Sequence, residues 1–117
     1  MCENKEMPLK KVCIAVEPGS CGLSCRIEGW QNGKQAAGLR ILDSQCEMIQ
    51  KLSNCFNEIT MKDLFVPVTK NRIFLAAERA GCHLACPVPV AMVKILEISL
   101  GLAVPKDVSI RFLDDFK

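Results

Sequence analysis

Cysteine is the residue type whose number and spacing in this chain most clearly indicate chemistry. Two pairs, Cys21–Cys25 and Cys82–Cys86, each enclose three residues, and Cys46 lies between the pairs. Thiolates bind soft metal ions and act as nucleophiles. The chain holds eight cysteines in 117 residues, at positions 2, 13, 21, 25, 46, 55, 82 and 86. At this density, without a secretion signal, they indicate metal or redox chemistry rather than disulfide bonds.

The metal interpretation places four cysteines in one site: Cys21, Cys46, Cys82 and Cys86. Cys21 follows a Pro-Gly turn, whereas Cys46 and Cys86 fall at predicted helix starts, where free N–H groups stabilise negative charge. Four thiolates satisfy either a zinc ion or an iron–sulfur cluster. The C-x₃-C spacing is tolerated at zinc sites without being diagnostic, and the ferredoxin spacings are absent. Both cofactors therefore stay open.

Thiol chemistry is the alternative use of the same residues. Cys86 directly precedes Pro87 at the start of a predicted helix, and a helix N-terminus lowers the pKa of a thiol. We expect Cys86 to be the catalytic nucleophile if the protein does thiol chemistry, with Cys82 or Cys21 as the resolving thiol. Whether the protein is an enzyme stays open, because no Ser-His-Asp pattern, paired histidines or phosphate-binding glycine loop accompanies the cysteines.

The remaining thiols and the single histidine have simpler interpretations. Cys13 and Cys55 are expected to pack as small buried apolar side chains. Cys25 lies on a predicted strand and is kept as an alternative ligand. His83 is adjacent to Cys82, and neighbouring residues rarely point at one metal ion, so we expect a loop residue with no metal role. A proton-donating role of His83 near Cys86 is left open.

Composition excludes several classes of partner. The formal net charge is +2 without a basic stretch, so we expect no nucleic acid. The longest apolar segment, 87–104, carries Lys94 and Glu97 and is interpreted as a buried helix, so we expect no membrane. The N-terminal residues are polar and charged and resemble no signal peptide. These features predict a cytoplasmic protein.

The first half of the chain is predicted to form three strands and a helix. Residues 11–17 form a strand, and 24–31 and 34–42 form a hairpin. Its Asn32-Gly33 pair predicts a two-residue type I′ turn, which places Trp30 opposite Gln35 and Cys25 opposite Arg40. A helix over 43–57 is predicted to begin at a Ser44/Glu47 capping box.

The second half is predicted to be mainly helical. A short helical turn covers 60–63, a helix over 70–80 ends at Gly81, and a central apolar helix begins after Cys86 and ends near Gly101. Residues 107–112 alternate polar and apolar and predict a final half-buried strand. The expected fold is a single α+β domain of order β-β-β-α-α-α-β. A mostly antiparallel sheet of about four strands carries helices on one face, and residues 1–8 are disordered.

A short motif resembles a known sulfur-transfer family. Cys86-Pro87-Val88-Pro89 is similar to the CPxP motif of TusA-like sulfur-carrier proteins, in which the cysteine at the helix start carries a persulfide. The resemblance covers four residues and the beginning of one helix. It implies a persulfide-carrying role for Cys86 and says nothing about the fold of the rest of the chain.

Taken whole, the chain resembles a family of small, uncharacterised proteins found mainly in anaerobic bacteria and archaea. The resemblance spans most of the length and rests on Pro18-Gly19, Cys21-Gly22, Ser44, Cys46, Cys86-Pro87-Val88-Pro89, Glu97, Gly101-Leu102 and Pro105-Lys106-Asp107-Val108. It implies a shared set of cysteines at 21, 46 and 86, and it implies no known activity.

Three interpretations of function follow. The first is a metal-binding protein that holds an iron–sulfur cluster or zinc through Cys21, Cys46, Cys82 and Cys86. The second is a thiol redox or sulfur-carrier protein that uses Cys86 and exchanges with a redox or sulfur-transfer protein partner. The third is a non-catalytic module that forms a homo-oligomer through an open sheet edge, with cysteines that merely pack.

Overall fold

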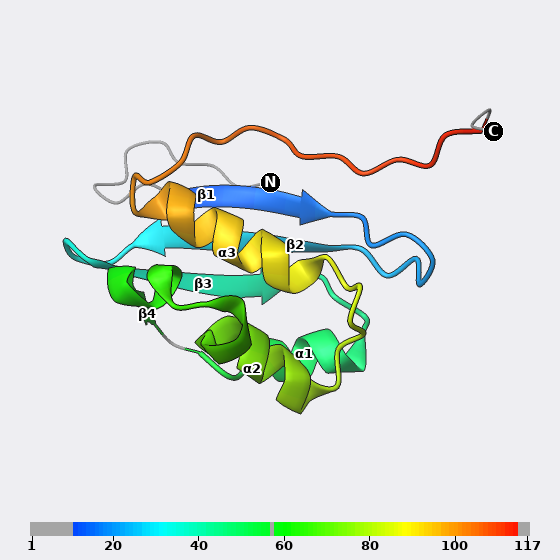
Figure 1. The fold of residues 1–117 in the computed structure, drawn as a ribbon, viewed down its shortest axis with the longest axis horizontal. Coiled ribbons are helices and arrows are strands. Elements are labelled where there is room, and N and C mark those ends of the chain that lie inside the picture. The colour runs from blue at the N-terminus through cyan, green and yellow to red at the C-terminus, as the bar shows by residue number, and fades with distance from the viewer. Residues whose placement is uncertain (1–10, 57, 115–117) are drawn as a thin grey trace.

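Figure 1 shows the fold in a computed structural model, which describes residues 11–56 and 58–114. The predicted disordered segment 1–8 and Cys2 lie outside these residues. Within them, a four-stranded antiparallel sheet has the order β1-β2-β3-β4, and α3 lies across it, with α1 and α2 beside β3. The α+β class is confirmed. The elements are β1 Lys11–Val16, β2 Cys25–Gln31, β3 Ala36–Leu42, α1 Glu47–Ser53, β4 Ile59–Thr60, the 3₁₀ helices η1 Met61–Phe65 and η2 Val68–Lys70, α2 Arg72–Ala80 and α3 Val88–Ser99.

The core lies between the sheet and α3. Met92, Ile95 and Leu96 of α3 and Ile27 of β2 are completely buried. Gly29 of β2 permits the close approach, because a Cβ there would lie 2.9 Å from the Ile95 side chain. The predicted central position of this apolar helix is confirmed. Among the described helices, none has the length and apolarity needed to span a membrane.

The hairpin is present, but its predicted turn and register are wrong. Gln31 pairs with Ala37 and Trp30 with Gly38, and Asn32 N–H donates to Ala36 O at 2.8 Å. Four residues, 32–35, lie between the end of β2 and the start of β3. Gly33 has a positive φ of 90°, but Asn32 does not, whereas a type I′ turn needs both. Gly38 explains the register, since a Cβ there would lie 2.7 Å from the Trp30 ring. Arg40 consequently faces Glu28 rather than Cys25, and Arg40 Nη2 donates to Glu28 Oε1 at 2.6 Å.

The start of α1 also differs from the prediction. The helix begins at Glu47 with Cys46 as its N-cap residue, and no side chain caps it. Ser44 instead accepts a hydrogen bond from Cys46 N–H at 3.2 Å, and its carbonyl oxygen accepts one from Gln50 Nε2 at 2.9 Å. The Ser44 hydroxyl therefore forms a local turn, a geometry that competes with capping in short polar segments.

The fourth strand of the sheet is β4, and not the predicted segment 107–112. β4 lies between α1 and η1 in the sequence and pairs with β3. Residues 107–112 run as an exposed, extended chain beyond β1 (Figure 1). Alternation along a sequence specifies which side chains share a face, but a strand also needs a neighbouring backbone to pair with. The described chain does not provide that neighbour.

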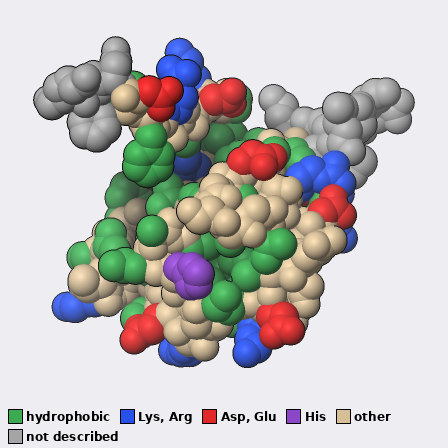
Figure 2. Space-filling model, turned by 90° about the vertical axis from the view of Figure 1, so that its right-hand side faces the viewer, with side chains coloured by type: hydrophobic (Ala, Val, Ile, Leu, Met, Phe, Trp, Pro, Cys, Tyr) green, Lys and Arg blue, Asp and Glu red, His purple; other side chains and the backbone are tan. Residues whose placement is uncertain are grey.

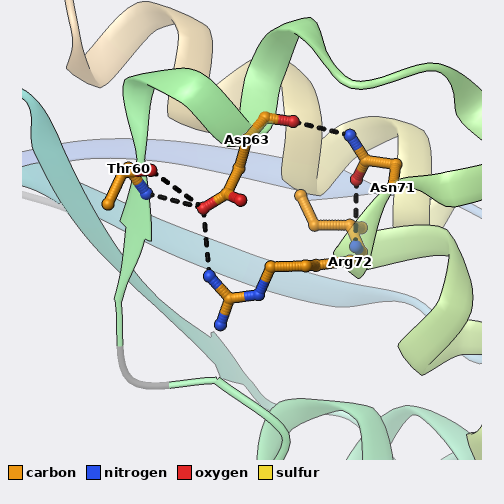
Figure 3. Close-up of polar contacts among 5 residues, drawn as sticks. Thr60, Asp63, Asn71 and Arg72 are labelled. Carbon is orange, nitrogen blue, oxygen red and sulfur yellow. Dashed lines mark hydrogen bonds and ion pairs between the residues drawn. The ribbon is translucent and has the colours of Figure 1, made fainter.

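A hydrogen-bonded network fixes the start of α2 (Figure 3). Asp63 Oδ2 accepts hydrogen bonds from Thr60 N at 2.9 Å, Thr60 Oγ1 at 3.1 Å and Arg72 Nη1 at 3.0 Å. Asn71, which is buried, accepts from Ile73 N at 2.9 Å and donates to the Asp63 carbonyl oxygen at 2.7 Å. The predicted helical turn at 60–63 and the helix ending at Gly81 are confirmed, as η1 and α2. We call Thr60, Asp63, Asn71 and Arg72 the Asp63 network.

Candidate functional site

Three loops and one strand start bring cysteines to the same end of the sheet. The loop between β1 and β2 carries Cys21, the loop between β3 and α1 carries Cys46, and the loop between α2 and α3 carries Cys82 and Cys86. Cys25 is the first residue of β2. Figure 1 shows these loops at the right-hand end of the sheet, and Figure 2 looks onto that end. Because antiparallel strands alternate in direction, β1 and β3 end where β2 begins.

Cys21 is presented by a glycine turn. Gly22 N–H donates to Gly19 O at 2.9 Å, and both glycines have positive φ angles, 91° for Gly19 and 69° for Gly22. Residues other than glycine rarely adopt this backbone conformation. The turn leaves Cys21 exposed at the rim of the site.

Cys82 and Cys86 are positioned by the end of α2 and the start of α3. Gly81, at φ 83°, ends α2, with Gly81 N–H bonded to Glu78 O at 3.1 Å and Cys82 N–H to Ala77 O at 3.0 Å. Cys86 N–H then donates to His83 O at 3.1 Å, which closes a tight turn. Cys82 and Cys86 are half-buried and pack against the core, whereas the His83 side chain is exposed.

The pKa values show that the thiols lie within electrostatic reach of one another. Burial and, to a smaller extent, the charges of Cys86 and Cys46 together raise the pKa of Cys25 from 9.0 to about 11. The pKa of Cys82 is raised by burial and then by Cys86, Cys46 and Cys55. Burial raises the pKa of Cys86, a hydrogen bond from Val88 N–H opposes this, and Cys46 and Cys21 raise it again.

These five thiols are linked electrostatically: Cys46 and Cys86 raise the pKa values of Cys25 and Cys82, and Cys46 and Cys21 raise that of Cys86. We call Cys21, Cys25, Cys46, Cys82 and Cys86 the five-thiol cluster. Strand alternation makes Cys25 a less favoured ligand than the other four, because it points the side chain toward the core, and this side chain is 4 % exposed. What the sequence could not show is that the buried face at this end of β2 also holds Cys86 and Cys46.

Two thiols lie differently from their predicted positions. Cys55, expected inside a helix body, follows the end of α1 and is exposed, with Sγ donating to Lys51 O at 3.4 Å. The helix stops at Ser53, four residues earlier than expected. Cys13, expected to pack as a free apolar side chain, is half-buried on β1 and disulfide-bonded.

The predicted low pKa of Cys86 is wrong. Its sulfur does receive the Val88 N–H hydrogen bond expected at a helix start, but burial beside Cys46 and Cys21 outweighs that bond, so the pKa is raised. The thiol is therefore mainly protonated near neutral pH. A protonated thiol is a poor nucleophile, and it binds a metal ion only by releasing its proton.

The cluster is not preassembled as a metal site. Within residues 11–56 and 58–114, no group of three or more His, Cys, Asp or Glu side chains stands close enough together to hold a metal ion. Two surface hollows, of about 200 and 250 Å³, are lined by residues that do not belong to the five-thiol cluster. The first is lined by Cys55, Phe56, Arg72, Leu75, Ala76 and Arg79, and the second by Ile41, Asp43, Ser44, Gln50, Ser53 and Asn54.

Residues 12–112 match the model of a family of unknown function (DUF6951). The chain belongs to this family. The match covers the five-thiol cluster and also the extended segment after α3. No curated protein and no solved structure matches the chain. Membership agrees with the likeness of the whole sequence to a family without a known activity, and it carries no information on a host organism or on sulfur carriers.

Proposed function

We propose that the protein binds a soft metal, as a zinc ion or an iron–sulfur cluster, through the five-thiol cluster. The observation that supports this most directly is the convergence of thiols from three loops and a strand start at one end of the sheet. Cys21 raises the pKa of Cys86, although the two residues are 65 positions apart in sequence. Packing alone does not require so many sulfur atoms in one place.

The charges of the cluster support a cation as the ligand. Ionising one thiol raises the pKa of its neighbours, and burial raises them further, so the apo cluster holds protons that a metal ion would replace. A bound cation deprotonates coordinating thiols and removes their mutual repulsion. Metal binding would therefore replace the protons that the raised pKa values keep on Cys25, Cys82 and Cys86.

Cys21, Cys46, Cys82 and Cys86 are the proposed ligands, and Cys25 is held behind them. Cys21 is exposed and Cys46, Cys82 and Cys86 are half-buried, whereas Cys25 is enclosed at the start of β2. All four proposed ligands lie on or next to loops, which can close around a metal ion. Cys25 is fixed by its pairing with Val16 on β1. Six cysteines of the described chain are free thiols, which suits a reducing compartment such as the cytoplasm, whereas Cys13 is disulfide-bonded.

The first experiment is purification without oxygen, followed by measurement of zinc, iron and acid-labile sulfide per chain and a visible absorption spectrum. We expect a stoichiometric metal content, with a broad visible band and labile sulfide if the cofactor is an iron–sulfur cluster. The same measurements are made on the double variant Cys46→Ser, Cys86→Ser, which should lose the metal. Cys55→Ser is the matched control, because Cys55 is exposed and is not one of the four proposed ligands.

Two results would contradict the proposal. One is a protein that contains no metal as isolated and takes up none on reconstitution with zinc or with iron and sulfide. The other is full metal retention in the double variant, which would place the metal elsewhere in the chain.

One observation favours a second candidate, a sulfur carrier that uses Cys86. The Val88 N–H group bonds to the Cys86 sulfur, and such a bond also stabilises a persulfide anion. In this function, Cys86–SH accepts the outer sulfur of a donor persulfide, so that R–S–SH and Cys86–SH give R–SH and Cys86–S–SH. Mass spectrometry after incubation with a persulfide donor should show one added sulfur on Cys86. Absence of the adduct, or equal labelling of Cys55, would count against it.

A further inference from the structure

The first of the two surface hollows, between α2 and the loop that follows α1, is lined by two arginine side chains. Its volume is about 200 Å³, roughly the room that six or seven water molecules occupy. Arg72 and Arg79 line it from α2, and Cys55 and Phe56 line it from the loop. The hollow is therefore large enough for a small organic molecule, and it carries positive charge.

One face of α2 forms a wall of this hollow. Arg72, Leu75, Ala76 and Arg79 follow the spacing i, i+3, i+4 and i+7, which places them in one row along a helix. The two arginines are two turns apart, about 10.5 Å along the helix axis, with Leu75 and Ala76 between them. Glu78, the acidic residue of α2, does not line the hollow. An apolar surface thus lies between two positive ends.

The two guanidinium groups differ in how much of their charge is used within the chain. Arg72 Nη1 donates to Asp63 Oδ2 at 3.0 Å (Figure 3), and Arg72 Cζ lies 5.9 Å from the centroid of the Phe56 ring. Both contacts hold the Arg72 guanidinium in place. Arg79 is exposed and has no hydrogen bond or ion pair within residues 11–56 and 58–114. Its planar guanidinium is therefore available to an oxyanion, which it can bind through two parallel hydrogen bonds.

We propose that this hollow binds a small organic anion, whose carboxylate or phosphate group pairs with Arg79 and whose apolar body packs on Phe56 and Leu75. An inorganic anion would leave the apolar surface in water, and a neutral molecule would leave Arg79 without a counter-charge. The ring of Phe56 favours an aromatic or similarly flat body. The volume suits a ligand about the size of benzoate. This proposal does not depend on the metal, because none of the proposed metal ligands lines the hollow.

The test is a titration of the reduced full chain with benzoate, with phenyl phosphate and with benzamide, followed by amide NMR spectra. Benzamide has the ring of benzoate without its charge. We expect saturable shifts of the amides of 55–56 and 72–79 with at least one of the two anions, with a Kd of about 1 mM or below. Benzamide should bind at least about tenfold more weakly, since it lacks the charge-assisted hydrogen bonds. The tighter of the two anions shows whether the site prefers a carboxylate or a phosphate.

Arg79→Gln removes the charge that the proposal assigns to recognition, so it should weaken binding of the anion at least about tenfold. Arg111→Gln is the matched control, because it makes the same substitution at an exposed residue outside the hollow. It should change the Kd less than about twofold, because it alters only the net charge, which salt screens. Arg79 is exposed, so its substitution should leave the core folded, and unchanged amide shifts of α3 verify this.

Four results would overturn the proposal. The first is a wild-type protein that binds neither anion saturably, and the second is a set of shifts that map outside the hollow. The third is benzamide binding as tightly as the anions, and the fourth is an equal effect of Arg79→Gln and Arg111→Gln. In the last two cases, Arg79 would not recognise the charge of the ligand.

Discussion

The Asp63 network and the five-thiol cluster are two polar groups that the fold treats in opposite ways. Burial acts to raise the pKa of Asp63, but hydrogen bonds from Thr60 and the charge and hydrogen bond of Arg72 hold it below its ordinary value. The Asp63 charge is thus satisfied inside the chain. The thiols of Cys25, Cys82 and Cys86 all have raised pKa values, because burial and neighbouring thiols disfavour their charged form.

The difference indicates which group is structural and which is available for a ligand. The Asp63 network joins η1 to the start of α2 with partners that are all side chains or backbone of this protein. In the five-thiol cluster, burial and neighbouring thiols raise the pKa values of Cys25, Cys82 and Cys86, and the hydrogen bond from Val88 N–H opposes this only at Cys86. A group that is complete without a ligand stabilises the fold, whereas a group of unsatisfied thiols gains by binding a cation.

Metal loading is expected to have the largest effect on stability, because binding energy available only to the folded state adds to folding. At free metal near a thousand times the Kd, the free energy of unfolding should rise by about 4 kcal/mol. Urea unfolding of the reduced protein with added metal and with a chelator measures this difference. If the unfolding curves with metal and with chelator coincide, the five-thiol cluster does not bind metal, and it would then be structural, as the Asp63 network is.

Alkaline pH should destabilise the metal-free protein, because it ionises the buried thiols. Since the folded state favours protonated Cys25, the stability it contributes is complete below pH 9.0 and is lost as pH rises toward about 11. The loss from this thiol is at most about 3 kcal/mol, and Cys82 and Cys86 act in the same direction. Urea unfolding as a function of pH tests this.

The matched variant for the alkaline effect is Cys25→Val, which keeps an apolar side chain in the core and cannot ionise. Its stability should decline less steeply above pH 9.0 than that of the wild type. An alkaline decline of equal slope in both proteins would show that Cys25 does not carry the effect.

Acid pH should act on the Asp63 network instead. Because the folded pKa of Asp63 is lowered, its contribution is complete above the unfolded value near 4 and is lost as pH falls through the folded value. Asp63→Asn should cost about 1 kcal/mol at neutral pH and should flatten the acid decline. Asp43→Asn is the control, since Asp43 forms an exposed ion pair with Arg26 and should change stability by less than about 0.5 kcal/mol. Equal costs for the two variants would contradict the assigned role of Asp63.

The smallest effect is expected at Cys55. Its side chain is exposed, and its Sγ bonds to a carbonyl oxygen within the same chain turn, Lys51 O. Cys55→Ser should alter stability by less than about 0.5 kcal/mol and leave the metal content unchanged. A loss of metal in this variant would extend the site toward Cys55, which already raises the pKa of Cys82.

Some signals that act over a few residues predicted the structure correctly, although the Ser44/Glu47 capping box and the Asn32-Gly33 turn did not. Gly81 ends α2 because its positive φ suits the helix terminus, and the apolar run after Pro87 forms a helix that is buried by its composition. Thr60 and Asp63 form a capping box over three residues. The α+β class and three of the four strands followed from such patterns, and so did the choice of Cys21, Cys46, Cys82 and Cys86 as candidates.

Features that depend on residues distant in the chain required the tertiary structure. The hairpin register is set by Trp30 packing over Gly38, which outweighs the turn preference of Asn32-Gly33. The raised pKa of Cys86 reflects Cys46 and Cys21, which no helix-start argument includes. Residues 107–112 have a strand pattern, yet no strand pairs with them in the described chain. Local sequence therefore determined which elements and thiols exist, and long-range packing decided their partners, because partners are supplied by backbone and side chains far away in sequence.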